Sequence, residues 1–469
     1  MTIFLALDVG TTAAKCVALD ESGAVLANAS GEYKLVIDAL GNRTQDPDAV
    51  WAQAINAIRG AVEQLGGKPV AALALSAAVH ALAAADADGR LLTPLITWAD
   101  SRAEYVARAL VHTELGEALH RETGTPIHPM SPLMKLCWFA QEQPDFLPAQ
   151  WWGIKEFIVW QLTGVRSTEV SSASASGLAE TATGRWSRMA LETAGIDESQ
   201  LAPINNCTDQ LPLSAAAASE LGLPTGLPVV LGGGDGPLAN IGSGAYLPDR
   251  IGITLGTSGA VRRVAYAPGI GEQRSRFCYS LGMNTWVVGR AQSNGSSALR
   301  WASRNWAPHL VTPAGGVDDQ AVLELAATAP EGSEGLQFAP FLLPERTPRW
   351  EQYVTARLDG LRAEHTTAHL LRACIEGVAE ALAAMARDVA SDVEGPTYWA
   401  TGGAFCGQLW RDALVRALGH EVNFSDDAEG TARGAAMMAA ISLGIAEDIA
   451  DAATKLGAPT SLLHAQNPA

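Results

Sequence analysis

The stretch that decides the fold is IFLALDVGTT, residues 3–12. Its first five residues form a short, continuously apolar run, which predicts a buried strand that ends at Asp8 and a Gly-Thr-Thr turn. The next stretch, KCVALD at 15–20, predicts a second strand. A strand, a Gly-Thr turn and a returning strand together predict an antiparallel hairpin at the start of the chain.

The same pattern returns in the middle of the chain. The stretch RIGITLGTSG at 250–259 is again an apolar strand with a Gly-Thr-Ser turn, and VRRV at 261–264 predicts the returning strand. Strand and helix patterns alternate elsewhere, which is typical of an α/β architecture. With 469 residues, the chain is too long for one ordinary core. We therefore expect two similar domains, 1–244 and 245–469, that face each other over a cleft.

The net charge excludes one class of partner. The chain has 50 Asp and Glu against 32 Lys and Arg, which gives a net charge of −18. Binding to a nucleic acid needs a basic stripe, so we expect no nucleic-acid partner. A nucleotide site in so acidic a protein must rely on backbone N–H groups, a helix terminus and a metal ion.

The sequence predicts a cytoplasmic protein without a membrane partner. The N-terminus lacks the basic region and the small-residue cleavage site of a signal peptide. The apolar stretch at 434–446 is too short to span a bilayer. The cysteines include no C-x-x-C pair, so we expect buried, reduced thiols. They are Cys16, Cys137, Cys207, Cys278, Cys374 and Cys406.

The first Gly-Thr turn has the chemistry of a phosphate loop. Gly10 lets the backbone approach a phosphate closely, and the hydroxyls of Thr11 and Thr12 can donate to its oxygens. The Asp8 carboxylate can hold hydrated Mg²⁺, and Lys15 on the returning strand could reach the same phosphate. The pattern D-x-G-T alone is more often a hairpin turn with a capping aspartate. The second copy at 256–258 favours the phosphate loop.

Asp235 is the candidate general base. It follows an apolar strand within GGGDG, residues 232–236, and precedes a helix of small residues at 237–242. The glycines leave room for a ligand beside the carboxylate, which can take a proton from a hydroxyl as that oxygen attacks phosphorus. The alternative is an aspartate that caps the helix. The second phosphate loop nearby favours the catalytic interpretation.

A third glycine-rich turn follows the strand predicted at 398–400. Gly402 and Gly403 open the next helix, and they could let a base or ribose lie flat against the backbone. Glycine pairs at such turns are common, so this signal is weak alone. The Rossmann and P-loop patterns are both missing from the sequence.

Together these segments resemble the FGGY family of carbohydrate kinases, within the actin, Hsp70 and sugar-kinase superfamily. The family's first signature is matched by MSPLMKLCWFAQE at 130–142. The second is matched by ARLDGL at 356–361 and by residues 369–376, with a departure at Cys374. The resemblance implies an α/β fold of two ribonuclease H-like domains that flank a catalytic cleft. It covers essentially the whole chain.

The resemblance also implies the cofactors ATP and Mg²⁺ and a role for each motif. Asp235 matches the general base, and both Asp235 and Asp8 match metal positions, Asp8 through water. The residues that match nucleotide-binding positions are Gly10, Thr11, Thr12, Lys15, Gly256, Thr257, Ser258, Asn294, Gly295, Gly402, Gly403 and Gln408.

The substrate segments look most like those of gluconate kinases within the family. They are 77–82, 96–102 and 124–130, and Gly236 after Asp235 points the same way. The expected reaction is phosphorylation of D-gluconate to 6-phosphogluconate. A xylulose, other ketopentose or polyol kinase is the alternative, and a non-catalytic sugar-sensing ATP-binding protein is the alternative from another class. The predicted substrate residues are Val79, His80, Trp98, Asp100, Arg102 and Asp235.

An acid substrate would need a cation, for which Arg102, His80 and Lys155 are the candidates. Arg102 could instead form an ion pair on a helix surface, and His80 could be a core histidine with its bonds satisfied. For Lys155 we expect a solvated helix position. Glu169 and Val79 stand where relatives more often have Asp and Met, which leaves room for a different pocket. A homodimer is possible.

Overall fold

The computed structural model describes residues 1–271, 274–312, 316–343, 346, 355–425, 428–457 and 461–463. The chain divides into two compact units. Unit 1 comprises Met1–Leu247, Val264–Val288 and Glu429–Ala458, and unit 2 comprises Pro248–Arg263, Gly289–Ala428 and Pro459–Ala469. Two late segments thus pack with the first unit. The division of the chain into domains 1–244 and 245–469, which was made from the sequence, stays a prediction.

Unit 1 is built on a six-stranded sheet in the order β12-β13-β6-β1-β2-β3. The predicted hairpin is confirmed, because β1 and β2 pair antiparallel while β1 and β6 pair parallel. The strands are β1 (Ile3–Val9), β2 (Ala13–Asp20), β3 (Val25–Glu32), β6 (Ala72–Ala77), β12 (Gln210–Pro212) and β13 (Pro228–Gly234).

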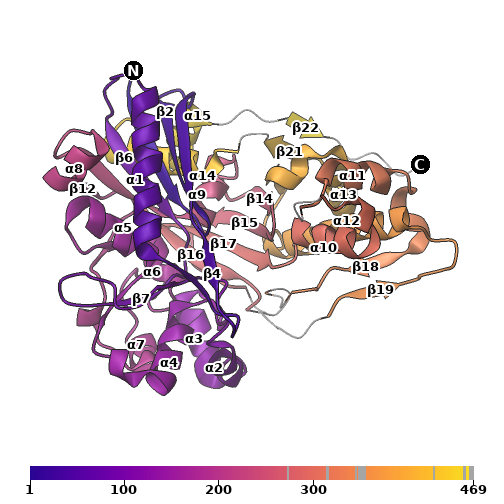
Figure 1. Cartoon of the computed structure of the whole chain (residues 1–469), viewed down its shortest axis with the longest axis horizontal. Helices are drawn as coiled ribbons and strands as arrows, with labels where there is room; N and C mark the ends of the chain where they lie inside the picture. Colours follow the sequence, from indigo (N-terminus) through magenta and orange to yellow (C-terminus); the bar gives the residue numbers. More distant parts are fainter. Residues whose placement is uncertain are drawn as a thin grey trace. The chain divides into compact units, whose positions relative to one another are not determined.

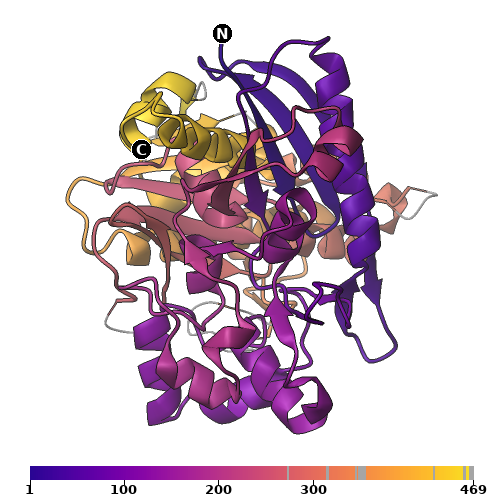
Figure 2. The ribbon, with the colours of Figure 1, turned by 90° about the vertical axis from the view of Figure 1, so that its left-hand side faces the viewer.

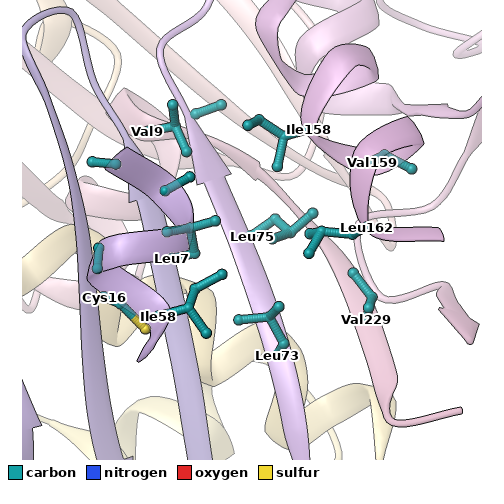
Figure 3. Packing of buried hydrophobic residues seen from close by; sticks show 14 of the residues in the cluster. Leu7, Val9, Cys16, Ile58, Leu73, Leu75, Ile158, Val159, Leu162 and Val229 are labelled. Carbon is teal, nitrogen blue, oxygen red and sulfur yellow. The ribbon is translucent and has the colours of Figure 1, made fainter. Parts of the chain in front are cut away.

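Successive side chains of β1 point to opposite faces of this sheet. Leu5, Leu7 and Val9 pack with α1 (Pro47–Gln64), α5 (Ile154–Thr163) and α8 (Ala215–Leu221). Figure 3 shows this core, with Leu73 of β6 pointing toward Ile58 of α1.

The other face of β1 presents Phe4 and Ala6 to α9 (Asp235–Gly242), α14 (Gly430–Ser442) and α15 (Ile449–Leu456). Figures 1 and 2 show α14 and α15 in yellow on this face, and α1 on the opposite one. Asp8 continues the alternation of Phe4 and Ala6, so it belongs to the face on which α9 begins.

Smaller elements complete unit 1. A three-stranded sheet joins β4, β5 and β8, and two-stranded pairs join β7 with β9 and β10 with β11. The strands are β4 (Leu35–Ile37), β5 (Arg43–Gln45), β7 (Ala83–Ala85), β8 (Leu95–Ile96), β9 (Gln150–Trp152), β10 (Thr168–Glu169) and β11 (Ile204–Asn205). The strand β16 (Phe277–Gly282) is instead the first strand in the order of a seven-stranded sheet. The helices are α2 (Glu104–Leu110), α3 (Glu114–Thr123), α4 (Pro132–Glu142), α6 (Val170–Ala175) and α7 (Arg188–Ala194).

Unit 2 repeats the central strand arrangement of unit 1. Its strands run β15-β14-β20-β21-β22, where β14 pairs antiparallel with β15 and parallel with β20. The order β2-β1-β6-β13 in unit 1 has the same directions, so the predicted duplication is confirmed. The strands are β14 (Arg250–Leu255), β15 (Gly259–Ala265), β20 (Thr397–Thr401), β21 (Val422–Ser425) and β22 (Ser461–Leu463).

The core of unit 2 packs this sheet against a group of helices (Figure 1). The long helix α12 (Thr367–Val389) places one apolar side in that core. The other elements are α10 (Ser296–Trp306), α11 (Asp319–Ala327), α13 (Gln408–Leu418), β18 (Gln337–Ala339) and β19 (Arg357–Asp359), while β17 (Thr285–Gln292) has residues in both units.

One prediction about buried groups can be judged from this packing. Five of the six cysteines are buried as free thiols, but Cys406 is exposed, so the prediction was wrong there. The reason is local, because Cys406 ends the short 3-10 helix Gly403–Cys406, a surface turn before α13. Within the part of the chain that the structure describes, no helix has the length and apolarity needed to cross a membrane.

Candidate active site

Asp8 ends β1 beside the neighbouring parallel strand β6. It lies opposite Ser76 in the strand register, and the Ser76 hydroxyl donates a hydrogen bond to Asp8 Oδ1 at 2.8 Å. Burial raises the pKa of Asp8 to about 6, and the negative charge of Asp235 acts in the same direction. Ser76, Lys155 and Lys15 oppose that rise in the Asp8 pKa. The fold therefore places the two predicted carboxylates within electrostatic reach of each other.

A bulge in β13 delivers Asp235. The register between β13 and β6 shifts between Val230 and Gly233. Gly232 has φ +66, and a Cβ there would lie 1.8 Å from the carbonyl oxygen of Leu75, so only glycine fits. Because the register of β13 shifts at this bulge, the end of the strand leads directly into α9.

Asp235 is the first residue of α9, and Gly234 is the N-cap. The alternative of a helix-capping aspartate was therefore wrong. Asp235 Oδ1 accepts a hydrogen bond from the N–H of Gly236 at 2.7 Å. A negative charge at a helix N-terminus is favoured by the helix dipole. The carboxylate thus belongs to the first turn of a helix that is packed against the central sheet.

Three side chains brace the predicted phosphate turn at residues 10–12, and sequence analysis missed two of them. Tyr33 donates from its hydroxyl to the carbonyl of Gly10 at 2.7 Å. Gln45 donates from Nε2 to the carbonyl of Thr11 at 2.8 Å, and Trp98 donates from Nε1 to Thr11 Oγ1 at 2.9 Å. Gln45 is only 2% exposed. The one feature that could have pointed to it is its place in a short strand after a turn.

Lys15 already has a carboxylate partner in unit 1. Its Nζ lies 2.5 Å from Oε1 of Glu429, the residue that precedes α14. Glu429 could not be found from sequence, because 414 positions separate it from Lys15. The role of Lys15 at a phosphate stays a prediction.

His80 has an unusual backbone conformation. Its φ is +72, which is rare for a residue other than glycine and is typical of functional sites. Its Nδ1 lies 2.8 Å from the carbonyl oxygen of Ala175, so this nitrogen donates, and its Nε2 lies 3.5 Å from the Tyr279 hydroxyl. Lys135 Nζ donates to the His80 carbonyl at 2.5 Å. The side chain is half-buried, which disfavours a core histidine.

Asp100 and Arg102 form one unit in the loop before α2. Arg102 donates from Nε to Asp100 Oδ1 at 2.8 Å and from Nη2 to Oδ2 at 3.0 Å. Asp100 Oδ2 also accepts from the N–H of Arg43 at 2.7 Å. The ion pair is therefore real, but it lies in a loop and not on a helix surface. The guanidinium lies over the ring of Trp138, 5.1 Å from its centroid.

Val79 contacts the turn before Asp235. A Cβ at Gly234 would lie 2.6 Å from Val79 Cγ1. A small cavity of about 40 Å³ lies beside Val79 and His80, and Trp151 and Lys155 also line it. This volume is enough for one or a few water molecules and too small for a sugar.

The expectation that Lys155 is solvated was wrong. Lys155 is 2% exposed, and its Nζ donates to the carbonyls of Leu231 at 2.7 Å and Gly233 at 3.0 Å. It also lies 3.7 Å from Oε1 of Glu169, which is itself fully buried. The helix α5 is apolar on most sides, and its buried side includes Lys155. Burial of this lysine is possible because backbone carbonyls accept hydrogen bonds from its ammonium and a carboxylate lies nearby.

Three predicted nucleotide segments meet in unit 2. The N–H of Gly295 donates to the carbonyl of Thr257 at 3.0 Å, and that of Ser296 donates to the carbonyl of Gly256 at 2.9 Å. A Cβ at Gly402 would lie 2.3 Å from the carbonyl oxygen of Leu255. The turn 256–258, the start of α10 and the turn at Gly402 are thus brought together.

The remaining nucleotide predictions differ in their surroundings. Asn294 exchanges two hydrogen bonds with the backbone of Leu343, at 3.0 and 2.8 Å, so its amide holds that segment. Gln408 begins α13 and donates to Asp412 at 2.8 Å. A larger pocket of about 830 Å³ in unit 2 lies along α12, and its described lining residues include none of these.

The residues present fit a nucleotide and a divalent cation. Apart from the chain neighbours of each glycine, no heavy atom of the described residues lies within 4 Å of a Cβ built at Gly256 or at Gly403, so open space borders the backbone at both turns. Among the described residues, no group of three or more His, Cys, Asp and Glu side chains gathers to hold a metal ion. Asp8 and Asp235 would therefore supply carboxylates, with water and phosphate oxygens as the other ligands, which suits Mg²⁺.

The duplicated α/β units and the two carboxylates define the class of protein. This is the two-domain α/β fold of the sugar kinases, related to actin and Hsp70, as predicted. The structure superposes on a xylulose kinase from Lactobacillus acidophilus with a TM-score of 0.93 and 28% identity, covering 99% of this chain and 94% of that one. It superposes on a gluconate kinase from Lactobacillus acidophilus with a TM-score of 0.91, at the same identity and coverage.

The sequence comparison identifies the family. Residues 3–242 match the N-terminal domain of the FGGY family of carbohydrate kinases, and residues 252–443 match its C-terminal domain. The chain belongs to this family. It is 33% identical over 442 residues to a gluconokinase of Bacillus subtilis (strain 168), covering 92% of this chain and 86% of the relative. The prediction of a carbohydrate kinase, and not a non-catalytic sensor, is confirmed, and kinases of this family use ATP as the phosphate donor.

Proposed function

We propose that this protein transfers the terminal phosphate of ATP to D-gluconate and forms 6-phosphogluconate, with Asp235 as the general base. The observation that carries the proposal is Asp235 in the first turn of α9, within electrostatic reach of Asp8 at the end of β1. Support for gluconate comes from the 33% identical gluconokinase. Support for a xylulose or related substrate comes from the superposed xylulose kinase, which makes a ketopentose the second candidate.

Asp235 acts on the acceptor hydroxyl. A negative charge is favoured at a helix N-terminus, and a carboxylate there can take the proton from a hydroxyl as the oxygen attacks phosphorus. Phosphoryl transfer needs positioning and charge stabilisation more than covalent chemistry from the protein. A Mg²⁺ bound through Asp8 and Asp235 would neutralise negative charge on the transferred phosphate.

The backbone turns bind the donor. The turn of Gly10, Thr11 and Thr12 offers N–H and hydroxyl donors for phosphate oxygens, with Lys15 on the next strand. The turn 256–258 in unit 2 is similar, with Gly-Thr-Ser in place of Gly-Thr-Thr. The start of α10, at Gly295 and Asn294, and the open backbone at Gly402 and Gly403 would hold the rest of the nucleotide, with Gln408 nearby in sequence.

The acceptor binds unit 1. His80 Nε2 is the ring nitrogen that can accept from a substrate hydroxyl or, when protonated, bind a carboxylate. Arg102 is a weaker candidate for the acid group, because Asp100 already neutralises its charge. Val79 lies against the turn before Asp235, and Trp98 contacts the phosphate turn, so both border the space where an acceptor would lie.

Turnover with a panel of acceptors tests the substrate. ADP release is measured with MgATP and gluconate, xylulose, ribulose, glycerol or erythritol. Strong turnover on gluconate alone supports the proposal, and turnover on xylulose alone replaces gluconate with the second candidate. Activity on neither would contradict both.

Substitution tests the base. Asp235→Asn should lower kcat roughly 10²–10⁴-fold and leave the KM for ATP largely unchanged. The matched control is Asp88→Asn, the same change at an exposed turn residue, which should leave turnover unchanged. Near-normal turnover of Asp235→Asn would remove Asp235 as the base.

A further inference from the structure

Lys155 satisfies the backbone at the bulge that precedes Asp235. Where the β13 register shifts, carbonyls lose their regular partners in the ladder. Lys155 Nζ donates to three of them, Leu231 at 2.7 Å, Gly233 at 3.0 Å and Leu75 at 3.3 Å. An ammonium has three N–H donors, so all of them are used on two adjacent strands.

No side chain of the bulge itself could donate a hydrogen bond to these carbonyls. Gly232 and the carbonyl of Leu75 are so close that a Cβ at Gly232 would lie 1.8 Å from that oxygen. The donor must come from outside the sheet, and α5 supplies it. A lysine suits this position because its long stem reaches from the helix while its head binds several acceptors.

Glu169 links the same lysine to the other side of the turn. It is fully buried and lies 3.7 Å from Lys155 Nζ. Its carboxylate accepts from the N–H groups of Ser171 at 2.5 Å and Ser172 at 3.0 Å, so it caps α6. The Ser171 hydroxyl in turn accepts from the N–H of Gly234 at 3.1 Å. Lys155 and Ser171 therefore hold consecutive residues, Gly233 and Gly234, directly before Asp235.

We propose that the Lys155–Glu169 pair positions Asp235 for catalysis, with Lys155 fixing Gly233 and Glu169 fixing Gly234 through Ser171. Lys155 is a positioning residue that acts through Asp235, so the inference rests on the proposed role of that residue. A buried ion pair is a poor source of stability compared with apolar packing, but it fixes a backbone geometry that apolar side chains cannot specify.

The test combines substitutions with a double-mutant cycle. Lys155→Met keeps the apolar stem but removes the ammonium that donates to three carbonyls, so kcat should fall about 10²-fold while the KM for ATP stays within about threefold. In the Asp235→Asn background the same change should lower kcat by less than about twofold, because there is no base left to misplace. A purely structural lysine would cost the same factor in both backgrounds.

Lys135→Met is the matched comparison. Lys135 is also fully buried and also donates to three carbonyls, of His80, Ile96 and Met130, but none belongs to the Asp235 turn. Its loss should raise the acceptor KM more than it lowers kcat, and its effect should persist in the Asp235→Asn background. Equal behaviour of the two lysine variants would overturn the proposal.

Circular dichroism and nucleotide binding show whether Lys155→Met folds. If it does not, Ser171→Ala provides the test instead. It removes one hydrogen bond at Gly234, so kcat should fall about fivefold, and this effect should vanish with Asp235→Asn. If Asp235→Asn is inactive and neither Lys155→Met nor Ser171→Ala lowers kcat, the positioning role fails alone. If Asp235→Asn retains turnover, the assignment of the base fails and the positioning role fails with it.

Discussion

The indole N–H of Trp98 donates to the Thr11 hydroxyl at 2.9 Å, which joins the predicted acceptor segment to the predicted phosphate turn at residues 10–12. A hydroxyl that accepts from an indole keeps its own proton for another acceptor. In Thr11 that acceptor would be a phosphate oxygen of the donor. The orientation of the phosphate turn therefore depends on a residue 87 positions away.

Trp98→Phe should weaken the donor site without unfolding the protein. The substitution removes the hydrogen bond to Thr11 and keeps most of the ring, so kcat/KM for ATP should fall about 3–10-fold. The matched control is Trp399→Phe, since Trp399 donates to the Thr397 hydroxyl at 3.2 Å in unit 2. Steady-state kinetics with varied ATP measures both. The same small effect in the two variants would contradict a role for the Trp98 contact.

The adjacent glycines 402 and 403 should respond differently to alanine. Gly402 has φ +122 and no room for a Cβ against Leu255, so Gly402→Ala should destabilise the fold by roughly 1–3 kcal/mol or more. Gly403 borders open space, so Gly403→Ala should leave the unfolding midpoint unchanged but raise the KM for ATP. Thermal unfolding and ATP kinetics separate the two. An unchanged KM in Gly403→Ala would argue against nucleotide at this turn.

Lys135 should make stability depend on pH above neutrality. Burial lowers the pKa of Lys135 from its ordinary 10.5 to about 7. Below pH 7 the folded protein bears the full cost of the buried charge. Between pH 7 and about 10 the unfolded chain binds one more proton than the folded one, so this cost is relieved as pH rises.

The measurement is urea unfolding of the wild type and Lys135→Met at pH 6, 7, 8 and 9. Above pH 7 the free energy of unfolding of the wild type should rise relative to the variant by up to about 1.4 kcal/mol per pH unit. Taking the difference removes the contributions of other groups that titrate in both proteins. Two curves that stay parallel across this range would show that the Lys135 pKa is not lowered.

Local patterns predicted most of the fold. The runs at 3–12 and 250–259 predicted two antiparallel hairpins, and both formed with a parallel strand beside them. These predictions held because alternation and helical periodicity depend on neighbours a few positions apart. Local patterns did not predict that residues 429–458 pack with unit 1.

In the sequence, glycines marked the two carboxylates of the candidate site. Asp8 and Asp235 stand beside glycines, and the structure brings them within electrostatic reach. Tyr33 and Gln45 carry no such mark, and they brace the phosphate turn from other strands. Cys406 was misjudged because its exposure depends on a surface turn.

The sequence by itself determined the duplicated hairpins, the glycine turns and the identity of the carboxylates, because each is a pattern within one short segment. Only the tertiary structure decided what the charged side chains do. Lys155, which helical periodicity assigns to solvent as readily as to a core, is buried against carbonyls from β6 and β13. A buried ammonium needs acceptors, and those acceptors come together only when strands distant in the sequence pair beneath α5.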